Sequence, residues 1–265
     1  DMVETDKITR DQAETAKSMK LGVVGGRAGA VDASDAPYFI DYLTRLVESQ
    51  YDERGRGSSL RSLRIYSTID LELQHAAYQA VSKNMVEVEK LLAKRKKGAE
   101  GLQAAMVAMN AKTGEIVAMV GGRDYSQSQL NRATDAHRQP GSSFKPYVFA
   151  AGLELGADKN KDEGGRITFT AASQLMDQPE PRWEERWNAK NYEAGKFEGY
   201  VLLRYALAKS LNTVSIRVLE RVGTDRIIDL AQRVGIDSKL PTTMSLALGA
   251  GEVTPLEMTN AMATF

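Results

Sequence analysis

The stretch Arg138-Gln-Pro-Gly-Ser142-Ser-Phe-Lys145-Pro146 decides the fold of this chain, because it marks where a buried helix begins. Proline is excluded from a helix interior, so Pro146 belongs to the first turn. Ser142 then lies at or just before the helix N-terminus, where unpaired backbone N–H groups and the positive end of the helix dipole favour a developing alkoxide. The strongly apolar run 144–155 predicts that this helix is buried.

Lys145 follows Ser142 by three residues, so the two side chains share one face of the helix. A cation is disfavoured at a helix N-terminus, and burial lowers a lysine pKa by up to about 3–5 units. Both effects favour the neutral amine, which can accept the proton of a serine hydroxyl. The alternative is that Ser142 only caps the helix and that Lys145 is solvated, since about one S-x-x-K is expected by chance in a chain of this size. On these residues alone, catalysis and capping are equally weighted.

A second polar segment, Lys209-Ser210-Leu-Asn212-Thr213, lies between two predicted helices. A hydroxyl and an amide two residues apart can face one cleft there, where Ser210 would relay a proton and Asn212 would bind substrate. The alternative is that Asn212 or Thr213 only caps the second helix, and for this segment alone capping is favoured. The same spacing in Ser82-Lys-Asn84 falls in the middle of a predicted helix, on a charged face, so that segment is not a candidate site.

The composition of the chain excludes several classes of function. Its 265 residues carry 35 Lys plus Arg and 35 Asp plus Glu, and this neutral balance gives no electrostatic footprint for nucleic acid. The absence of Cys excludes disulfides, thiol catalysis and thiolate metal sites. With only His75 and His137 present, a His-rich metal centre is not expected. His137 is predicted to be a surface or hydrogen-bonded residue, because Lys145 already fills the role of base.

Periodic patterns along the chain predict helices mixed with hairpin-connected strands. This mixture favours the α/β class in its α+β form, an antiparallel sheet flanked by helices. The predicted strands are 63–68, 104–109 and 115–120. The predicted helices are 1–20 with a Thr9–Gln12 capping box, a run from Pro37, a helix capped by Asp70 and ended by the basic residues 94–97 and Gly98, 144–155, 201–208, 213–222, 224–234 capped by Thr224, and one opened by a capping box of Thr254 and Glu257.

The remaining segments are expected to connect these elements. Glycine and polar residues predict loops at 22–29, 52–59 and 158–200. The last helix has no stop signal before Phe265, so it is expected to continue and more protein should follow.

Ser142-x-x-Lys145 followed by Ser210-x-Asn212 resembles the serine penicillin-recognising enzymes. Five further stretches narrow the resemblance to class A (bifunctional) penicillin-binding proteins, namely 66–74, 112–125, 131–134, 138–141 and 246–255. The similarity covers nearly the whole chain. It implies the transpeptidase fold that penicillin-binding proteins and β-lactamases share, incomplete here at its C-terminus.

The resemblance also implies three parts in the chain. Residues 1–30 resemble the tail of an upstream glycosyltransferase domain with a connector, and residues 31–100 form a linker or inter-domain region. Residues 101–265 form the N-terminal part of a truncated transpeptidase domain. Glycosyltransferase activity would belong to the full-length protein and not to this chain.

In the reaction that the resemblance implies, Ser142 attacks the carbonyl of the penultimate D-alanine in a peptidoglycan stem peptide and Lys145 takes its proton. Ser210 passes the proton to the leaving amine, and Asn212 holds the substrate amide. An amine from a neighbouring stem then resolves the acyl-enzyme and forms a crosslink. Penicillin would mimic the D-Ala-D-Ala terminus and acylate Ser142.

Three residues of the long loop are expected to line the approach to the serine, with core packing as the alternative: Trp187, Asn191 and Tyr192. The backbone N–H of Ser142 would supply one half of an oxyanion hole, and a residue after Phe265 would supply the other. Without that residue and the family's third motif, the stretch on its own is expected to be nearly inert.

Two departures from the family pattern bear on the function. Lys112-Thr-Gly114 precedes the serine motif and occupies a hairpin turn, whereas the family's catalytic Lys-Thr-Gly follows the S-x-N motif on a strand, so this one is not expected to be catalytic. β-Lactamases carry Ser-Asp-Asn and a downstream Glu, whereas Leu211 is the middle residue here. The sequence therefore favours a transpeptidase over a hydrolase.

The expected partners are peptidoglycan stem peptides, lipid-linked precursor glycan strands and β-lactam antibiotics, with no metal, organic cofactor or nucleic acid. The resemblance places the protein on the outer face of the bacterial inner membrane, in the periplasm, held by an N-terminal anchor that is absent from this chain. The alternative function is a catalytically silent sensor or scaffold that binds penicillin or stem peptides.

Overall fold

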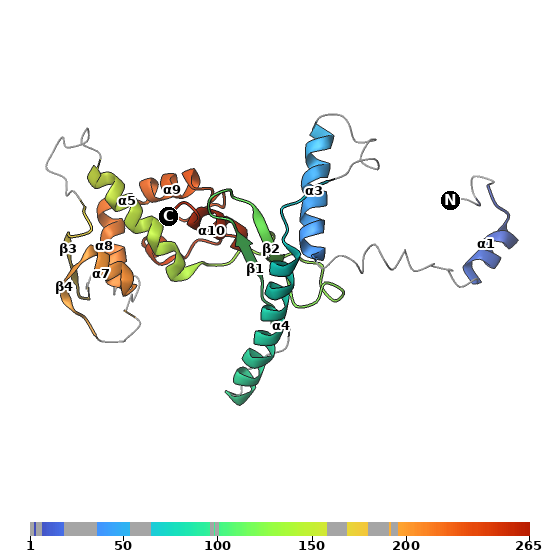
Figure 1. Ribbon diagram of the computed structural model, residues 1–265, viewed down its shortest axis with the longest axis horizontal. Helices are drawn as coiled ribbons and strands as arrows, with labels where there is room; N and C mark the ends of the chain where they lie inside the picture. Colours follow the sequence, from blue (N-terminus) through green and yellow to red (C-terminus); the bar gives the residue numbers. More distant parts are fainter. Residues whose placement is uncertain are drawn as a thin grey trace.

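A computed structural model describes residues 3, 7–18, 36–53, 65–95, 98, 101–157, 169–179, 191 and 196–265. Figure 1 shows the elements in order along the chain: α1 (Arg10–Ser18), α3 (Pro37–Glu53), α4 (Leu71–Lys94), β1 (Met106–Met109), β2 (Ile116–Val120), the 3-10 turn η2 (Gly141–Phe144), α5 (Lys145–Ala157), β3 (Gln174–Asp177), β4 (Gly199–Leu202), α7 (Leu203–Ala208), α8 (Asn212–Val222), α9 (Thr224–Arg233), η4 (Met244–Leu248) and α10 (Pro255–Met262).

The antiparallel hairpin of β1 and β2 packs against α3 and α4 (Figure 1). Asp70 caps α4, its carboxylate accepting the backbone N–H groups of Glu72 and Leu73 at 2.9 and 3.1 Å. The buried side-chain amide of Gln74 then pairs with the backbone of Met119 in β2, donating at 3.0 Å and accepting at 2.8 Å. A polar side chain on α4 thus makes the hydrogen bonds that a neighbouring strand would make with the backbone at the edge of β2.

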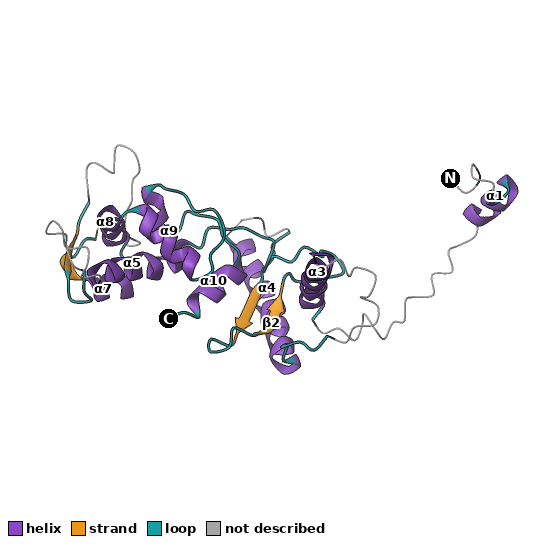
Figure 2. Cartoon of the chain, turned by 90° about the horizontal axis from the view of Figure 1, so that it is seen from above, coloured by secondary structure: helices purple, strands orange, loops and turns teal. Residues whose placement is uncertain are grey.

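The first group of packed elements is thus α3, α4, β1 and β2. A second group, helices α5, α7, α8 and α9, surrounds the largest apolar core, with α5 among the others (Figure 2). Helix α5 packs against α7, α8 and α9, and the two aromatic side chains at its start, Phe144 and Tyr147, are fully buried. The buried positions of α5 lie in its first two turns, up to Gly152, which explains why this part of the helix is almost entirely apolar. Helix α10 connects the two groups, because it packs on β1 and also contributes Ala261 to the largest core.

The predicted class, an α/β fold with antiparallel strands flanked by helices, is confirmed. Within the described ranges the strands form two separate two-stranded antiparallel sheets, β1–β2 and β3–β4. The first of these is the predicted hairpin, and its turn closes with a hydrogen bond from Gly114 N to Asn110 O at 2.8 Å.

The predicted helix caps are confirmed at three helix starts. Thr9 and Gln12 exchange hydrogen bonds at the start of α1, at 2.8 and 3.2 Å. Thr254 and Glu257 form a complete capping box at the start of α10, with Pro255 in its first turn. Asp70 is the third cap, and these signals were readable because each involves residues within one turn of one another.

Four predicted elements are wrong in part. The described residues 65–68 of the predicted strand 63–68 are not strand, because only Thr68 bonds toward β2, through its hydroxyl to Ile116 O at 2.7 Å. The predicted helix 201–208 begins at Leu203, since the two residues before it pair with β3. Strand β3 itself lies inside the predicted loop 158–200. Thr224 is the first residue of α9 rather than its cap, because Gly223, with φ of +86°, occupies that position.

Two predicted boundaries also move. Helix α10 ends at Met262 with Ala263 as its cap, so the expected continuation of this helix through Phe265 is wrong. Helix α3 extends to Glu53, into the start of the predicted loop 52–59. The rest of that loop, the connector 22–29 and residues 96–97 of the basic cluster lie outside the described residues.

Candidate active site

Ser142 and Lys145 lie where the sequence predicts, at the entrance to α5. Ser142 belongs to the 3-10 turn η2, Lys145 is the first residue of α5, and Pro146 is the second. The two side chains differ sharply in exposure, because Ser142 is exposed whereas Lys145 is 1% exposed. The Ser142 hydroxyl makes no hydrogen bond with any other residue that the structure describes. A free hydroxyl therefore lies one turn from a buried amine.

The Lys145 amine converges on the second predicted motif. Its Nζ donates to the backbone oxygen of Ser210 at 2.5 Å, to Ser210 Oγ at 2.9 Å and to Asn212 Oδ1 at 2.6 Å. Burial lowers the pKa of Lys145 to about 8, because the apolar surroundings disfavour the charged form. No carboxylate is paired with this amine among the described residues.

This arrangement suits a group that exchanges a proton. An ammonium has three protons, and the three acceptors around Lys145 take all of them. The neutral amine has two protons and a lone pair, so one contact must change when the proton leaves. The Ser210 hydroxyl can then donate to the lone pair, or the lone pair can instead accept the proton of a second hydroxyl.

Ser210 occupies a strained backbone position between α7 and α8. Its φ is +54°, and it is the only residue other than glycine with positive φ in the part of the chain that the structure describes. The N–H of Ser210 bonds Leu207 O at 2.9 Å and the N–H of Leu211 bonds Ala206 O at 2.9 Å. This is the Schellman ending of a helix, in which glycine is the usual residue at the left-handed position. A serine there keeps a side chain that glycine lacks, at a cost of roughly 1–2 kcal/mol.

Asn212 is the first residue of α8, and Asn191 lies beneath that helix start. The side-chain oxygen of Asn191 accepts the backbone N–H of Asn212 at 2.9 Å, and its amide nitrogen donates to the carboxylate of Asp177 at 2.8 Å. Asn191 is 8% exposed. Contact of Asn191 with substrate stays a prediction, and the contacts that the structure shows are with the protein itself.

Asp177 is a residue of the site that the sequence did not reveal. It is the last residue of β3 and is fully buried. No motif surrounds it, and its partners Asn191, Glu198 and Thr213 follow it at separations of 14 to 36 residues. A single aspartate in a polar stretch gives no signal of such a role.

Two glycines bring the C-terminal segment against η2. Gly141 N donates to Gly249 O at 3.2 Å, and the φ angles of these glycines are +58° and +72°. A Cβ at Gly249 would overlap the carbonyl group of Gly141. The stretch 246–255 therefore supports the turn that carries Ser142, and a glycine at 249 is required for that approach.

The other predicted positions lie away from this cluster. His137 is exposed, and its Nδ1 lies 3.2 Å from Ser238 Oγ, as expected of a hydrogen-bonded surface residue. Lys112-Thr-Gly114 forms the exposed turn between β1 and β2, so its predicted location is confirmed. Ser82 and Asn84 lie in the middle of α4. Trp187 and Tyr192 lie outside the described residues.

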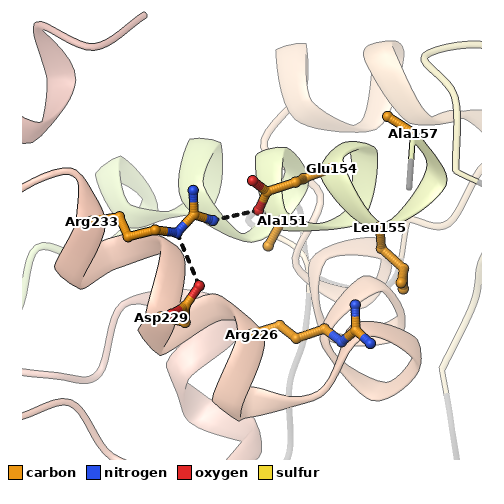
Figure 3. A pocket seen from close by; sticks show the side chains of 7 residues that line it. All are labelled: Ala151, Glu154, Leu155, Ala157, Arg226, Asp229 and Arg233. Atoms are coloured by element: carbon orange, nitrogen blue, oxygen red, sulfur yellow. Dashed lines mark hydrogen bonds and ion pairs between the residues drawn. The ribbon is translucent and has the colours of Figure 1, made fainter. Parts of the chain in front are cut away.

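A cavity of about 570 Å³ between α5 and α9 does not include the cluster (Figure 3). Arg233 crosses it, bonding Glu154 at 2.6 Å and Asp229 at 3.0 Å. The cavity holds no candidate nucleophile. Its lining residues are charged or apolar: Ala151, Glu154, Leu155, Ala157, Arg226, Asp229 and Arg233.

The described ranges show neither a cluster of metal ligands nor a membrane-spanning helix. They contain no group of three or more His, Cys, Asp or Glu side chains that could hold a metal ion. They also contain no helix with the length and apolar character needed to cross a bilayer.

Residues 104–265 match the family model described as the penicillin binding protein transpeptidase domain. The chain is 41% identical over 170 residues to penicillin-binding protein 1A of Neisseria flavescens, and 42% identical over 164 residues to that of Aquifex aeolicus. Each alignment covers 62% of this chain but only 20% or 21% of the relative. The chain therefore spans about a fifth of the length of these curated relatives.

Solved structures share the fold at lower sequence identity. Penicillin-binding protein 1A from Haemophilus influenzae aligns over 99% of this chain and 50% of its own, with a TM-score of 0.66 and 21% identity. The PonA1 protein of Mycobacterium tuberculosis in complex with penicillin V aligns over 86% of this chain and 57% of its own, with a TM-score of 0.60 and 22% identity.

Proposed function

Since the chain belongs to the penicillin-binding protein transpeptidase family, we propose that it carries the serine machinery of a D,D-transpeptidase that crosslinks peptidoglycan stem peptides. The observation that carries this proposal is the buried Lys145 amine, bonded to Ser210 and Asn212 one turn from the exposed Ser142. A lysine with a pKa lowered to about 8 can serve as a general base near neutral pH. Stem peptides and β-lactams are the proposed ligands.

The proposed reaction has two balanced steps. In the first, Ser142 Oγ bonds to the carbonyl carbon of the penultimate D-alanine while its proton passes to Lys145 Nζ. The amide bond then breaks, and Ser210 Oγ gives its proton to the nitrogen of the departing terminal D-alanine and takes in return the proton held by Lys145 Nζ. In the second, the amine of a neighbouring stem attacks the ester and regenerates the Ser142 hydroxyl. Asn212 holds the substrate amide, and the Ser142 N–H contributes to the oxyanion hole.

Penicillin fits the same scheme as an acylating agent, because opening its strained lactam ring forms an ester on Ser142. One structural relative is described in complex with penicillin V, which supports this part of the proposal. The whole protein is proposed to be a bifunctional cell-wall synthase with an upstream glycosyltransferase, acting on lipid-linked glycan strands and anchored on the periplasmic face of the inner membrane. The three-part division at residues 30 and 100 belongs to the same proposal.

The function is tested by release of D-alanine. The whole product of the gene that encodes these residues is incubated with a peptide ending in D-Ala-D-Ala and an acceptor amine. We expect one D-alanine released for each new amide bond, and no release after pretreatment with penicillin. Covalent binding of penicillin without any D-alanine release would contradict the transpeptidase and support the silent sensor.

Replacing Ser210 by Gly should change stability and activity in opposite directions. Glycine relieves the left-handed backbone, so the free energy of unfolding should rise by about 1 kcal/mol. Loss of the hydroxyl should slow acylation by penicillin by about 10²-fold or more. Thermal unfolding and labelling with a fluorescent penicillin measure the two effects. The control Ser210→Ala keeps the strain and should lose activity without gaining stability, and equal activity in wild type and Ser210→Gly would refute the proton relay.

A further inference from the structure

Helix α8 begins without a cap of its own. Leu211 occupies the cap position, and its side chain accepts no hydrogen bond. The N–H groups at the start of a helix have no partner within it and need one from outside. Asn212 is the first residue of this helix, so the position of a proposed site residue depends on how the helix start is held.

The side chain of Asn191, twenty residues before Leu211 in the sequence, caps the start of α8. Its Oδ1 accepts the N–H of Asn212 at 2.9 Å and lies 3.5 Å from the N–H of Thr213. Its Nδ2 donates to Asp177 Oδ1 at 2.8 Å. The two ends of this amide cannot be exchanged, because a carboxylate only accepts hydrogen bonds and backbone N–H groups only donate them. Asp177 therefore sets which end of Asn191 faces the helix.

Asp177 also holds the residue that follows Asn212. The hydroxyl of Thr213 donates to Asp177 Oδ1, and the backbone N–H of Glu198 donates to Oδ2 at 3.0 Å. Asp177 and Thr213 are both fully buried. The three donors that these contacts bring to the carboxylate are uncharged, and two of them, the Asn191 amide and the Thr213 hydroxyl, lie at the start of α8.

One chain of hydrogen bonds joins this buried carboxylate to the proposed base. It runs from Asp177 to Asn191, from the Asn191 oxygen to the backbone of Asn212, and from the Asn212 side chain to Lys145 Nζ at 2.6 Å. We propose that Asp177, acting through Asn191 and Thr213, is a positioning residue that holds Asn212 against the Lys145 amine. This proposal rests on the proposed function, because its consequence is the rate at which Ser142 is acylated.

The test uses Asn191→Ala together with the matched pair Thr213→Val and Thr213→Ser in the whole gene product. The rate constant for acylation by a fluorescent penicillin is measured from pH 6 to 10, and the final labelled fraction counts the folded sites. Asn191→Ala should slow acylation on the order of 10²-fold and displace the midpoint of its pH profile, since Lys145 loses a fixed partner. Thr213→Val should slow it in the same way, and Thr213→Ser, which keeps the hydroxyl, should restore the wild-type rate.

Two controls separate the outcomes. Val222→Ala, at the far end of α8, should lower the melting temperature without changing the rate or the pH midpoint. If Asn191→Ala and Thr213→Val behave like Val222→Ala, the positioning role is refuted. Ser142→Ala tests the function itself: if it still becomes labelled, the proposed function fails. If it is not labelled while Asn191→Ala reacts at the wild-type rate, only the positioning role fails.

Discussion

Replacing Ser142 by Ala should abolish covalent labelling of the intact protein by penicillin. The hydroxyl is the only group that we propose to bond with the lactam carbonyl, and removal of a serine nucleophile costs on the order of 10⁶-fold in rate. The Ser142 side chain is exposed and makes no hydrogen bond with another described residue, and its backbone carbonyl keeps its bond from Lys145 N in the variant. The substitution should therefore leave the melting temperature near that of the wild type.

The neighbouring Ser143 provides a matched control. Its hydroxyl donates to Pro140 O at 2.6 Å, so it is held within the turn and is not available as a nucleophile. Ser143→Ala should keep most of the labelling, whereas Ser142→Ala should show none by intact mass. If labelling were lost in Ser143→Ala and kept in Ser142→Ala, the nucleophile would be Ser143 and the assignment of Ser142 would be wrong.

Replacing Lys145 by Arg should slow acylation by about 10²–10⁴-fold, the usual contribution of a positioned general base. Arginine keeps the positive charge but does not lose its proton in proteins, so it cannot accept the proton of Ser142. The measurement is the acylation rate constant of folded protein, with the melting temperature recorded beside it. A rate within a few fold of wild type would show that Lys145 contributes charge and not proton transfer.

The pH dependence of the wild type tests the same point without a substitution. Only the neutral amine can act as base, and burial lowers the pKa of Lys145 to about 8. The acylation rate should therefore rise about tenfold for each pH unit below about 8 and level off above it. Spontaneous hydrolysis of penicillin at high pH is measured without protein and subtracted. A rate that is constant from pH 6 to 10 would contradict this role.

Local signals in the sequence predicted much of the fold. The capping box at Thr254, the cap at Asp70 and the turn before Gly114 each depend on residues within a few positions, and all three are present in the structure. Strands β3 and β4 were missed because neither has an alternating pattern, and each is stabilised by pairing with a strand more than twenty residues away.

The features of the site that depend on neighbouring residues were predictable, and those that depend on distant residues were not. The resemblance assigned Lys145, Ser210 and Asn212 to one reaction, and the structure adds that the Lys145 amine bonds directly to Ser210 and Asn212. The left-handed backbone of Ser210 was not predictable, since serine gives no sign that it will occupy a position suited to glycine. The link through Asp177 was hidden because it exists only once β3 packs beneath α8.

The position of the penicillin adduct shows which residue is the nucleophile. The whole protein is labelled, denatured and digested with trypsin, which leaves peptide 139–159 intact across the bond between Lys145 and Pro146. This peptide should carry the added mass of one penicillin, and fragment ions that separate residues 142 and 143 should place it on Ser142. An adduct on Ser143, or on any other peptide of the protein, would contradict the account.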